Sequence, residues 1–183
     1  MMKRYLCFYF AIAVISLTAC TSSQTPQVPQ LPAVQPKVVT LDNTVKVVAG
    51  ETVYVPIYSH IYTVERDRTW NLTATLSVRN TDQTYPVIIA SVDYYDSNGS
   101  LLRKYLEQPI ELKPLASTNF IVDQNDVSGG AGAAFIVEWV AQSKVSSPVI
   151  EAIMINTVGN QGLSFVSNGR VIKSRTSGQS SGQ

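Results

Sequence analysis

The chain has 183 residues, 45% of them hydrophobic and 15% charged, which supports one packed domain and excludes wholesale disorder. Its 14 Lys and Arg residues nearly balance its 13 Asp and Glu residues, so the net charge offers no basis for binding nucleic acid. Both cysteines, Cys7 and Cys20, lie near the N-terminus. The remainder of the chain therefore excludes a disulfide framework, a thiolate metal cluster and a cysteine nucleophile, and we expect no cofactor.

Residues 1–19 predict a secretory signal peptide. A basic start precedes an apolar run from Tyr5 to Leu17, which is shorter than the roughly 20 residues of a membrane-spanning helix. The run ends in LTAC, whose last residue is Cys20, and this motif resembles the lipobox of bacterial lipoproteins. The resemblance implies cleavage before Cys20, lipid attachment to its sulfur and stable anchoring through two or more acyl chains. The alternatives are an ordinary cleavable signal and an uncleaved short anchor.

The same resemblance implies a location outside the cytoplasm. Thr21 follows the cysteine, in place of the aspartate that marks retention at the inner membrane of Gram-negative bacteria. We therefore expect a lipid-anchored cell-envelope protein, at the outer membrane and facing the periplasm if the host is Gram-negative.

A proline-rich linker follows the lipidated cysteine within residues 20–37. Its prolines, at positions 26, 29, 32 and 36, favour an extended polyproline II path of about 3.1 Å per residue. The segment predicts a stalk, and recruitment of a proline-binding module is the alternative. At the other end of the chain, residues 174–183 form a Ser, Gly and Gln tail that we expect to be disordered.

Residues 38–173 predict a single β domain. Apolar and polar residues alternate from Asn71 to Arg79 with the period-two pattern of a half-buried strand, and no segment shows helical spacing. About seven to nine short antiparallel strands are expected, which favours a sandwich. The strand candidates are residues 44–48, 52–57, 71–79, 86–95, 101–112, 118–122, 134–142 and 149–157, with weaker ones at 163–166 and 170–172.

Two Asn-Gly pairs predict hairpin turns between these strands. Asn98-Gly99 supplies two positive-φ residues for a type I′ turn, and Asn168-Gly169 offers a second turn. Trp139 has the inward parity of its strand and is the expected anchor of the core.

Two resemblances agree with this architecture. Immunoglobulin-like and fibronectin-type modules have a pattern similar to LSVRNTD, VIIASVDYYDSNGSLL and LKPLASTNFIV, which lie in residues 76–122. The chain more closely resembles a family of uncharacterised bacterial lipoproteins. The segments that carry this resemblance are ETVYVPIYSHIY, SVRNTD, YYDSNG, PLAS and GGAGAAFIVEW. The first resemblance implies an all-β fold, a single Ig-like or fibronectin-like antiparallel β-sandwich. The second covers nearly all of residues 38–172 and implies no activity and no functional residue.

One strand candidate carries aromatic side chains of a single parity. Such side chains combine flat apolar area with hydrogen-bonding tips, a mixture enriched at recognition surfaces. The alternative is that they cover a sheet face or lie under a loop. His60 is the only histidine, so a His-rich zinc site is excluded and a Ser-His-Asp triad would depend on this residue. The candidate binding surface consists of Tyr54, Tyr58, His60 and Tyr62.

A second candidate site is a set of polar residues near predicted turns. Their carboxylates and amide are oxygen ligands suited to calcium, although the spacing and closing glutamate of an EF-hand are absent. The alternative is that the aspartates cap backbone groups. The nearby glycine-rich run, residues 128–132, lacks the Lys-Ser/Thr of a phosphate-binding loop and is expected to be a flexible connection. The candidate polar loop consists of Asp93, Asp96, Asn98 and Asp126.

We expect a non-enzymatic binding or assembly module of the envelope, tethered to the membrane by its lipid and meeting an envelope protein or a glycan. A hydrolase or carbohydrate-active enzyme is one alternative, and it requires two convergent carboxylates. A structural envelope subunit is the other, and it requires an edge strand or apolar patch that self-associates. The carboxylates available for a pair are Asp93, Asp96, Asp123, Asp126 and Glu138.

Overall fold

The computed structural model describes residues 36–42, 45–65, 67–159 and 162–176. The chain divides into two compact units, Met1–Val34 and Gln35–Gln183, and the described residues belong to the second. The predicted signal peptide, Cys20 and the linker up to residue 35 lie outside the described residues, as do residues 177–183 of the predicted tail. In the described ranges no helix is long and apolar enough to cross a membrane.

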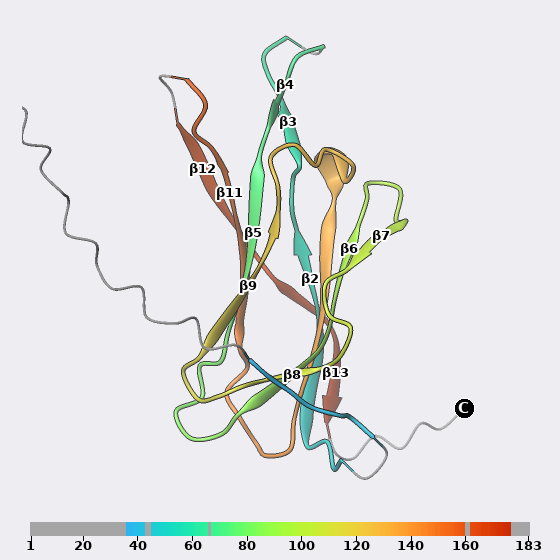
Figure 1. The fold of residues 1–183 in the computed structure, drawn as a ribbon, viewed down its shortest axis with the longest axis vertical. Helices are drawn as coiled ribbons and strands as arrows, with labels where there is room; N and C mark the ends of the chain where they lie inside the picture. The colour runs from blue at the N-terminus through green and yellow to red at the C-terminus, as the bar shows by residue number, and fades with distance from the viewer. Residues whose placement is uncertain (1–35, 43–44, 66, 160–161, 177–183) are drawn as a thin grey trace, which may run out of the picture. The chain divides into compact units, whose positions relative to one another are not determined.

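Two antiparallel sheets make up the described domain, as Figure 1 shows. The larger has seven strands, in the order β1-β8-β6-β10-β2-β13 with β7 also paired to β6, and the smaller has the order β12-β11-β5-β9. A short hairpin, β3-β4, is paired separately. The prediction of an all-β, antiparallel sandwich is confirmed. The strands are β1 (Lys37–Val38), β2 (Ala49–Pro56), β3 (His60–Tyr62), β4 (Thr69–Asn71), β5 (Thr73–Arg79), β6 (Val87–Tyr95), β7 (Leu101–Lys104), β8 (Ile110–Leu112), β9 (Ser117–Val122), β10 (Ala134–Ala141), β11 (Val149–Asn156), β12 (Leu163–Asn168) and β13 (Arg170–Thr176), with a 3₁₀ turn η1 (Gly130–Gly132) before β10.

Side chains from both sheets form one hydrophobic core. Phe135, Val137 and Trp139 of β10 are buried in it, together with Leu76 of β5 in the other sheet. Trp139 is 2% exposed, and its indole Nε1 donates a hydrogen bond to Glu51 Oε2 at 3.2 Å. The indole nitrogen thus has a partner despite its burial, as a core tryptophan requires. The predicted role of Trp139 as a core anchor is confirmed.

Three boundary predictions are wrong. Residues 101–112 form two strands, because the chain turns after β7 and the Tyr105 N–H donates to the Val92 carbonyl at 2.9 Å before β8 begins. Of the candidate strand 44–48, residues 45–48 are not in a strand, and β2 begins at Ala49. At the C-terminal side β13 continues past residue 173, since Arg175 pairs with Gly50 of β2.

The two Asn-Gly pairs also behave differently from the prediction. A turn does join β6 to β7 at the predicted place, but of its residues only Gly99 has a positive φ, 81°, so the turn is not type I′. The Ser100 N–H donates to Asp96 Oδ1 at 2.7 Å and the Gly99 N–H donates to the Asp96 carbonyl at 3.0 Å, so the aspartate closes the turn. The pair at 168–169 forms no hairpin, because β12 and β13 belong to different sheets.

Different strands and hairpins lie at the two ends of the sandwich. β1 enters at one of them, where Lys37 pairs with Glu111 of β8, and we call this the entry end. The tips of the β3–β4 and β11–β12 hairpins lie at the other, which we call the hairpin end (Figure 1). β2, β5, β6, β10 and β11 run between the two ends, so the length of the domain separates the hairpin tips from β1.

Candidate functional site

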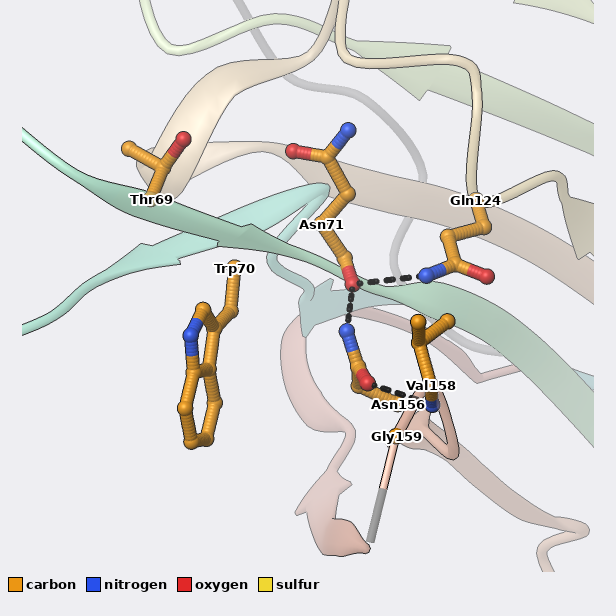
Figure 2. Close-up of a pocket in the computed structure, with 7 residues that line it drawn as sticks. All are labelled: Thr69, Trp70, Asn71, Gln124, Asn156, Val158 and Gly159. Atoms are coloured by element: carbon orange, nitrogen blue, oxygen red, sulfur yellow. Dashed lines mark hydrogen bonds between the residues drawn. The ribbon is translucent and has the colours of Figure 1, made fainter. Parts of the chain in front are cut away.

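An open hollow of about 770 Å³ lies at the hairpin end. Three segments far apart in the chain supply its walls: β4, the turn that follows β9, and the β11–β12 hairpin. Every lining residue that the structure describes is uncharged, and one is a tryptophan. The lining residues, all drawn in Figure 2, are Thr69, Trp70, Asn71, Gln124, Asn156, Val158 and Gly159.

The register of the smaller sheet brings these segments together. Ala74 of β5 pairs with Val122 of β9 on one side and with Met154 of β11 on the other. All three side chains are buried, which fixes the register because a slip by one residue would turn each toward water. Gln124 and Asn156 each lie two residues beyond those partners. They therefore reach opposite sides of the chain where it enters β5.

A backbone carbonyl organises the polar side of the hollow, as Figure 2 shows. The Asn71 carbonyl accepts hydrogen bonds from Asn156 Nδ2 at 2.7 Å and from Gln124 Nε2 at 3.5 Å. Asn156 Oδ1 in turn accepts the Val158 N–H at 2.9 Å. Both amide planes are thus oriented by the protein. Each amide nitrogen carries two hydrogens, so each retains an N–H beyond the one given to Asn71.

Trp70 supplies the apolar side. Its side chain is 43% exposed although it belongs to β4, whose register with β3 places it opposite Ile61. In Figure 2 the indole projects on the opposite side of β4 from the side chains of Thr69 and Asn71. A large, flat apolar ring is therefore presented to the solvent beside oriented amides, a combination found in small-molecule sites.

The structure places the predicted aromatic surface with the expected parity but divides its members among different surroundings. Tyr54 is exposed on the outer face of the larger sheet. Tyr58 packs edge-on against Phe165 of β12, with ring centroids 5.6 Å apart. His60 and Tyr62 pack against each other at 5.6 Å. The chain leaves β2 after Pro56 and re-forms a strand only at His60, so the four do not continue along one strand.

Tyr54 and Asp96, from the two different predicted sets, meet at a second hollow of about 400 Å³. Tyr95 also lines it, and Ala134 and Ile136 of β10 add apolar side chains. The hollow lies on the larger sheet because Tyr54 and Asp93 both pair with Ile136, which places β2 and β6 on either side of β10.

The predicted polar loop is a set of capped turns. Backbone N–H donation, above all from Ser100, lowers the pKa of Asp96. Asp126 accepts hydrogen bonds from the Ser128 hydroxyl and backbone and forms an ion pair with Arg103 Nη2 at 2.9 Å, and these contacts lower its pKa. In the described part of the chain no three His, Cys, Asp or Glu side chains gather as metal ligands. The capping alternative therefore accounts for Asp96 and Asp126.

Asp93 and Asn98, the other two residues of the candidate polar loop, do not add ligands to Asp96 and Asp126. Asp93 lies within β6, in register with Lys104 of β7. Asn98 contributes its backbone N–H, which donates to Asp96 Oδ1 at 2.8 Å. Two further carboxylates were considered for a catalytic pair: Glu138 Oε2 lies 3.8 Å from Arg175 Nη2, and Asp123 Oδ1 accepts the Asn125 N–H at 2.9 Å.

The glycine-rich run is hydrogen-bonded in place, in contrast to the flexible connection that was expected. Ser97 Oγ donates to the Gly129 carbonyl at 2.8 Å and accepts the Gly132 N–H at 2.9 Å. A Cβ at Gly129 would lie 2.0 Å from the Tyr94 hydroxyl. Glycine is needed here because the loop closes directly over a buried tyrosine.

The sequence predictions missed the residues of the first hollow. Thr69 and Trp70 lie before the alternating segment that predicted β5, and β3 and β4 are too short to show a period. Gln124 and Asn156 are 53 and 85 residues from Asn71, and no local pattern relates them. The one available signal was the TWN tripeptide itself, a tryptophan between polar residues.

The described domain is thus an all-β antiparallel sandwich with an uncharged hollow at one end. The chain belongs to the family described as "Protein of unknown function (DUF3124)", whose family model matches residues 50–172. Among solved structures, the one titled "Crystal Structure of Thermotoga maritima 1070" is similar at 11% sequence identity and a TM-score of 0.42, covering 66% of this chain and 92% of that chain. A comparison with curated proteins finds no match.

Proposed function

We propose that this protein is a lipid-anchored, non-enzymatic binding module of the bacterial cell envelope, which presents the hollow at its hairpin end to a ligand. The observation that carries this proposal is the hollow itself, with an exposed Trp70 beside amides oriented on the Asn71 carbonyl. These groups are suited to binding and orienting a ligand. Among the described residues, the lining includes no carboxylate, histidine or lysine that could transfer a proton.

The lipid anchor is supported by the LTAC motif at Cys20 and by the proline-rich stalk after it. β1 connects to the stalk at the entry end of the sandwich, and the hollow lies at the hairpin end. The Ig-like character of the sandwich belongs to the same proposal, supported by the buried Trp139 between its sheets.

The rival proposal of a hydrolase with paired carboxylates finds less support. A general acid in such a pair needs a raised pKa, so that it is protonated at neutral pH. The pKa values of Asp96 and Asp126 are instead lowered by the hydrogen bonds they accept. Both side chains accept hydrogen bonds that close turns.

Photo-crosslinking in intact cells tests the binding role. A photo-crosslinking amino acid at Val158, which lines the hollow, should form an adduct whose mass identifies the bound molecule as glycan, peptide or protein. The same amino acid at Val38, an exposed residue of β1 at the entry end, is the matched control. Adducts at neither position, or equal adducts at both, would contradict a ligand site at the hairpin end.

The tether is tested separately by Cys20→Ser. We expect loss of metabolic labelling with an acyl-chain probe and a shift of the protein from the membrane to the soluble fraction. Unchanged membrane association would contradict the lipid anchor. Thermal unfolding of the domain should be unchanged, since the described core is built from residues between Val53 and Met154.

One observation favours the second candidate function, a structural subunit that associates with its own copies. The outer face of the smaller sheet carries a cross-strand row in which Ile121, Ile153 and Val166 are 57%, 41% and 56% exposed. Light scattering of the wild type and of Ile153→Lys tests it. A concentration-dependent oligomer that the lysine disperses would support this role, and a monomer throughout would end it.

A further inference from the structure

The hollow at the hairpin end has a lining that defines the chemistry of its ligand, and this inference rests on the proposed binding function. Charge is the first constraint. The seven lining residues in the described part of the chain carry no ionisable side chain. Of the described charged residues in the turn before β4, Arg68 and Glu65 are paired with each other at 3.1 Å, and Asp67 is not part of the lining. A phosphate, carboxylate or ammonium group would find no opposite charge among these lining residues to replace its water, so the lining favours a neutral ligand.

Shape is the second constraint. Trp70 offers a flat face that is 43% exposed, and Val158, 68% exposed, lies across the hollow from it in Figure 2. Flat apolar contact suits a ligand with an apolar face of ring size. The C–H face of a pyranose ring has these properties, and stacking it on the indole removes apolar area of both partners from water.

Hydrogen bonding is the third constraint. Gln124 and Asn156 each hold one amide N–H on the Asn71 carbonyl, which fixes the direction of the second N–H before a ligand arrives. Gln124 Oε1 has no hydrogen-bond partner among the described residues and remains available as an acceptor. Fixed donors and acceptors in one wall match adjacent hydroxyl groups of a sugar, and their orientation lowers the entropy lost on binding.

A peptide that pairs with β4 as an added strand fits less well. Strand addition requires open backbone groups along an edge. The Asn71 carbonyl of β4 is already occupied by two side-chain amides. Pairing at this position would break both bonds and displace the side chains that shape the hollow.

We propose that the hollow formed by Trp70, Gln124 and Asn156 binds a neutral saccharide, with one sugar ring stacked on the indole and its hydroxyls hydrogen-bonded to the two amides.

The test is direct binding to the full lipoprotein in a zwitterionic detergent, since glycosidic detergents would compete. The probes are chitotriose, cellotriose and maltotriose as neutral saccharides and N-acetyl-trialanine amide as a neutral peptide. Isothermal titration calorimetry measures affinity, and tryptophan emission reports stacking. The chain has two tryptophans, and Trp139 is 2% exposed, so a saccharide-induced emission change that disappears in Trp70→Phe arises at Trp70.

Four variants make the test specific. Trp70→Ala should weaken saccharide binding by about tenfold or more, and Trp70→Phe should recover much of it. Gln124→Ala should also weaken it. Tyr85→Ala removes an exposed aromatic ring that does not line the hollow and should leave binding unchanged. Thermal unfolding of each variant confirms that the fold is intact.

Two outcomes overturn the saccharide proposal. Failure of all three saccharides to bind is one, and binding that Trp70→Ala leaves unchanged is the other. Binding of the peptide alone, lost in Trp70→Ala, would overturn the saccharide proposal while the proposed binding function survives. The proposed binding function fails separately, through the absence of a position-specific adduct at Val158 in cells.

Discussion

The backbone of Gly169 lies directly against that of Ile150: the glycine N–H donates to the Ile150 carbonyl at 2.9 Å. At this point the chain passes from β12 in the smaller sheet to β13 in the larger one. A Cβ on Gly169 would lie 2.6 Å from the Ile150 oxygen and 2.7 Å from Val53 Cγ1. The close approach of two backbones, and not a turn, is the reason for glycine here.

Gly169→Ala should therefore destabilise the domain by about 1–3 kcal/mol, as overpacking against backbone does. Gly162→Ala is the matched control, because its Cβ would have 4.0 Å to the nearest atom, the Asn156 carbonyl oxygen. Urea unfolding measures both. Equal stability of the two variants would contradict the close approach at Gly169.

Ser97→Ala should loosen the glycine-rich loop. The hydroxyl both donates to the Gly129 carbonyl and accepts the Gly132 N–H, so its loss removes two hydrogen bonds and costs about 1–2 kcal/mol. Hydrogen exchange should accelerate at the Gly132 amide. Ser100→Ala, in the same hairpin turn, is the control, because the Ser100 hydroxyl makes no hydrogen bond among the described residues. Unchanged exchange in Ser97→Ala would show that the loop does not depend on this hydroxyl.

The domain should become less stable in acid, because three aspartates accept hydrogen bonds that favour their ionised form. Hydrogen bonds from backbone or hydroxyl donors lower the pKa values of Asp82, Asp96 and Asp126 in the folded state relative to 3.8. The unfolded chain therefore binds protons more readily. The stabilisation is complete above pH 3.8 and is lost as the pH falls through the lowered pKa values.

Thermal unfolding between pH 7 and pH 2 measures this decline. The triple variant Asp82→Asn, Asp96→Asn, Asp126→Asn keeps an acceptor oxygen at each site but removes the titrating groups, so its stability should vary less with pH over the acidic range. A triple variant with the same acid dependence as the wild type would assign the decline to other groups.

Leu115→Asn should stabilise the domain. Leu115 has φ of 59°, follows Pro114 in the turn closed by the Ala116 N–H and the Lys113 carbonyl, and is 69% exposed. Leucine is strained in this left-handed region, whereas asparagine tolerates it, and the gain should be about 0.5–1 kcal/mol. Leu115→Val should have the opposite sign, because a β-branched residue is least compatible with positive φ. If Leu115→Asn destabilises the domain instead, the contacts of the leucine side chain stabilise the fold by more than the backbone strain destabilises it.

Local patterns accounted for the long strands and failed for the short ones. The alternation that predicted β5 arises because one face of that strand packs against the core, and the bounds of β6, β9, β10 and β11 agree with the other predicted candidates to within one residue. β3 and β4 have three residues each, too few for a period, and their pairing depends on the crossing of the chain between two sheets. The Asn-Gly pair at 168–169 was wrongly assigned a hairpin for a related reason. Local turn preference was overridden by the packing of Gly169 against Ile150.

The amino-acid sequence by itself determined the class of this protein: a β domain with a buried Trp139, preceded by a segment that resembles a lipoprotein signal. The sequence is sufficient for this because strand periodicity and signal motifs depend on residues that are neighbours in the chain. Only the tertiary structure decided which residues line the hollow at the hairpin end. Asn71, Gln124 and Asn156 meet because Ala74 pairs with Val122 on one side and Met154 on the other, and that register is set by burial of the whole sheet.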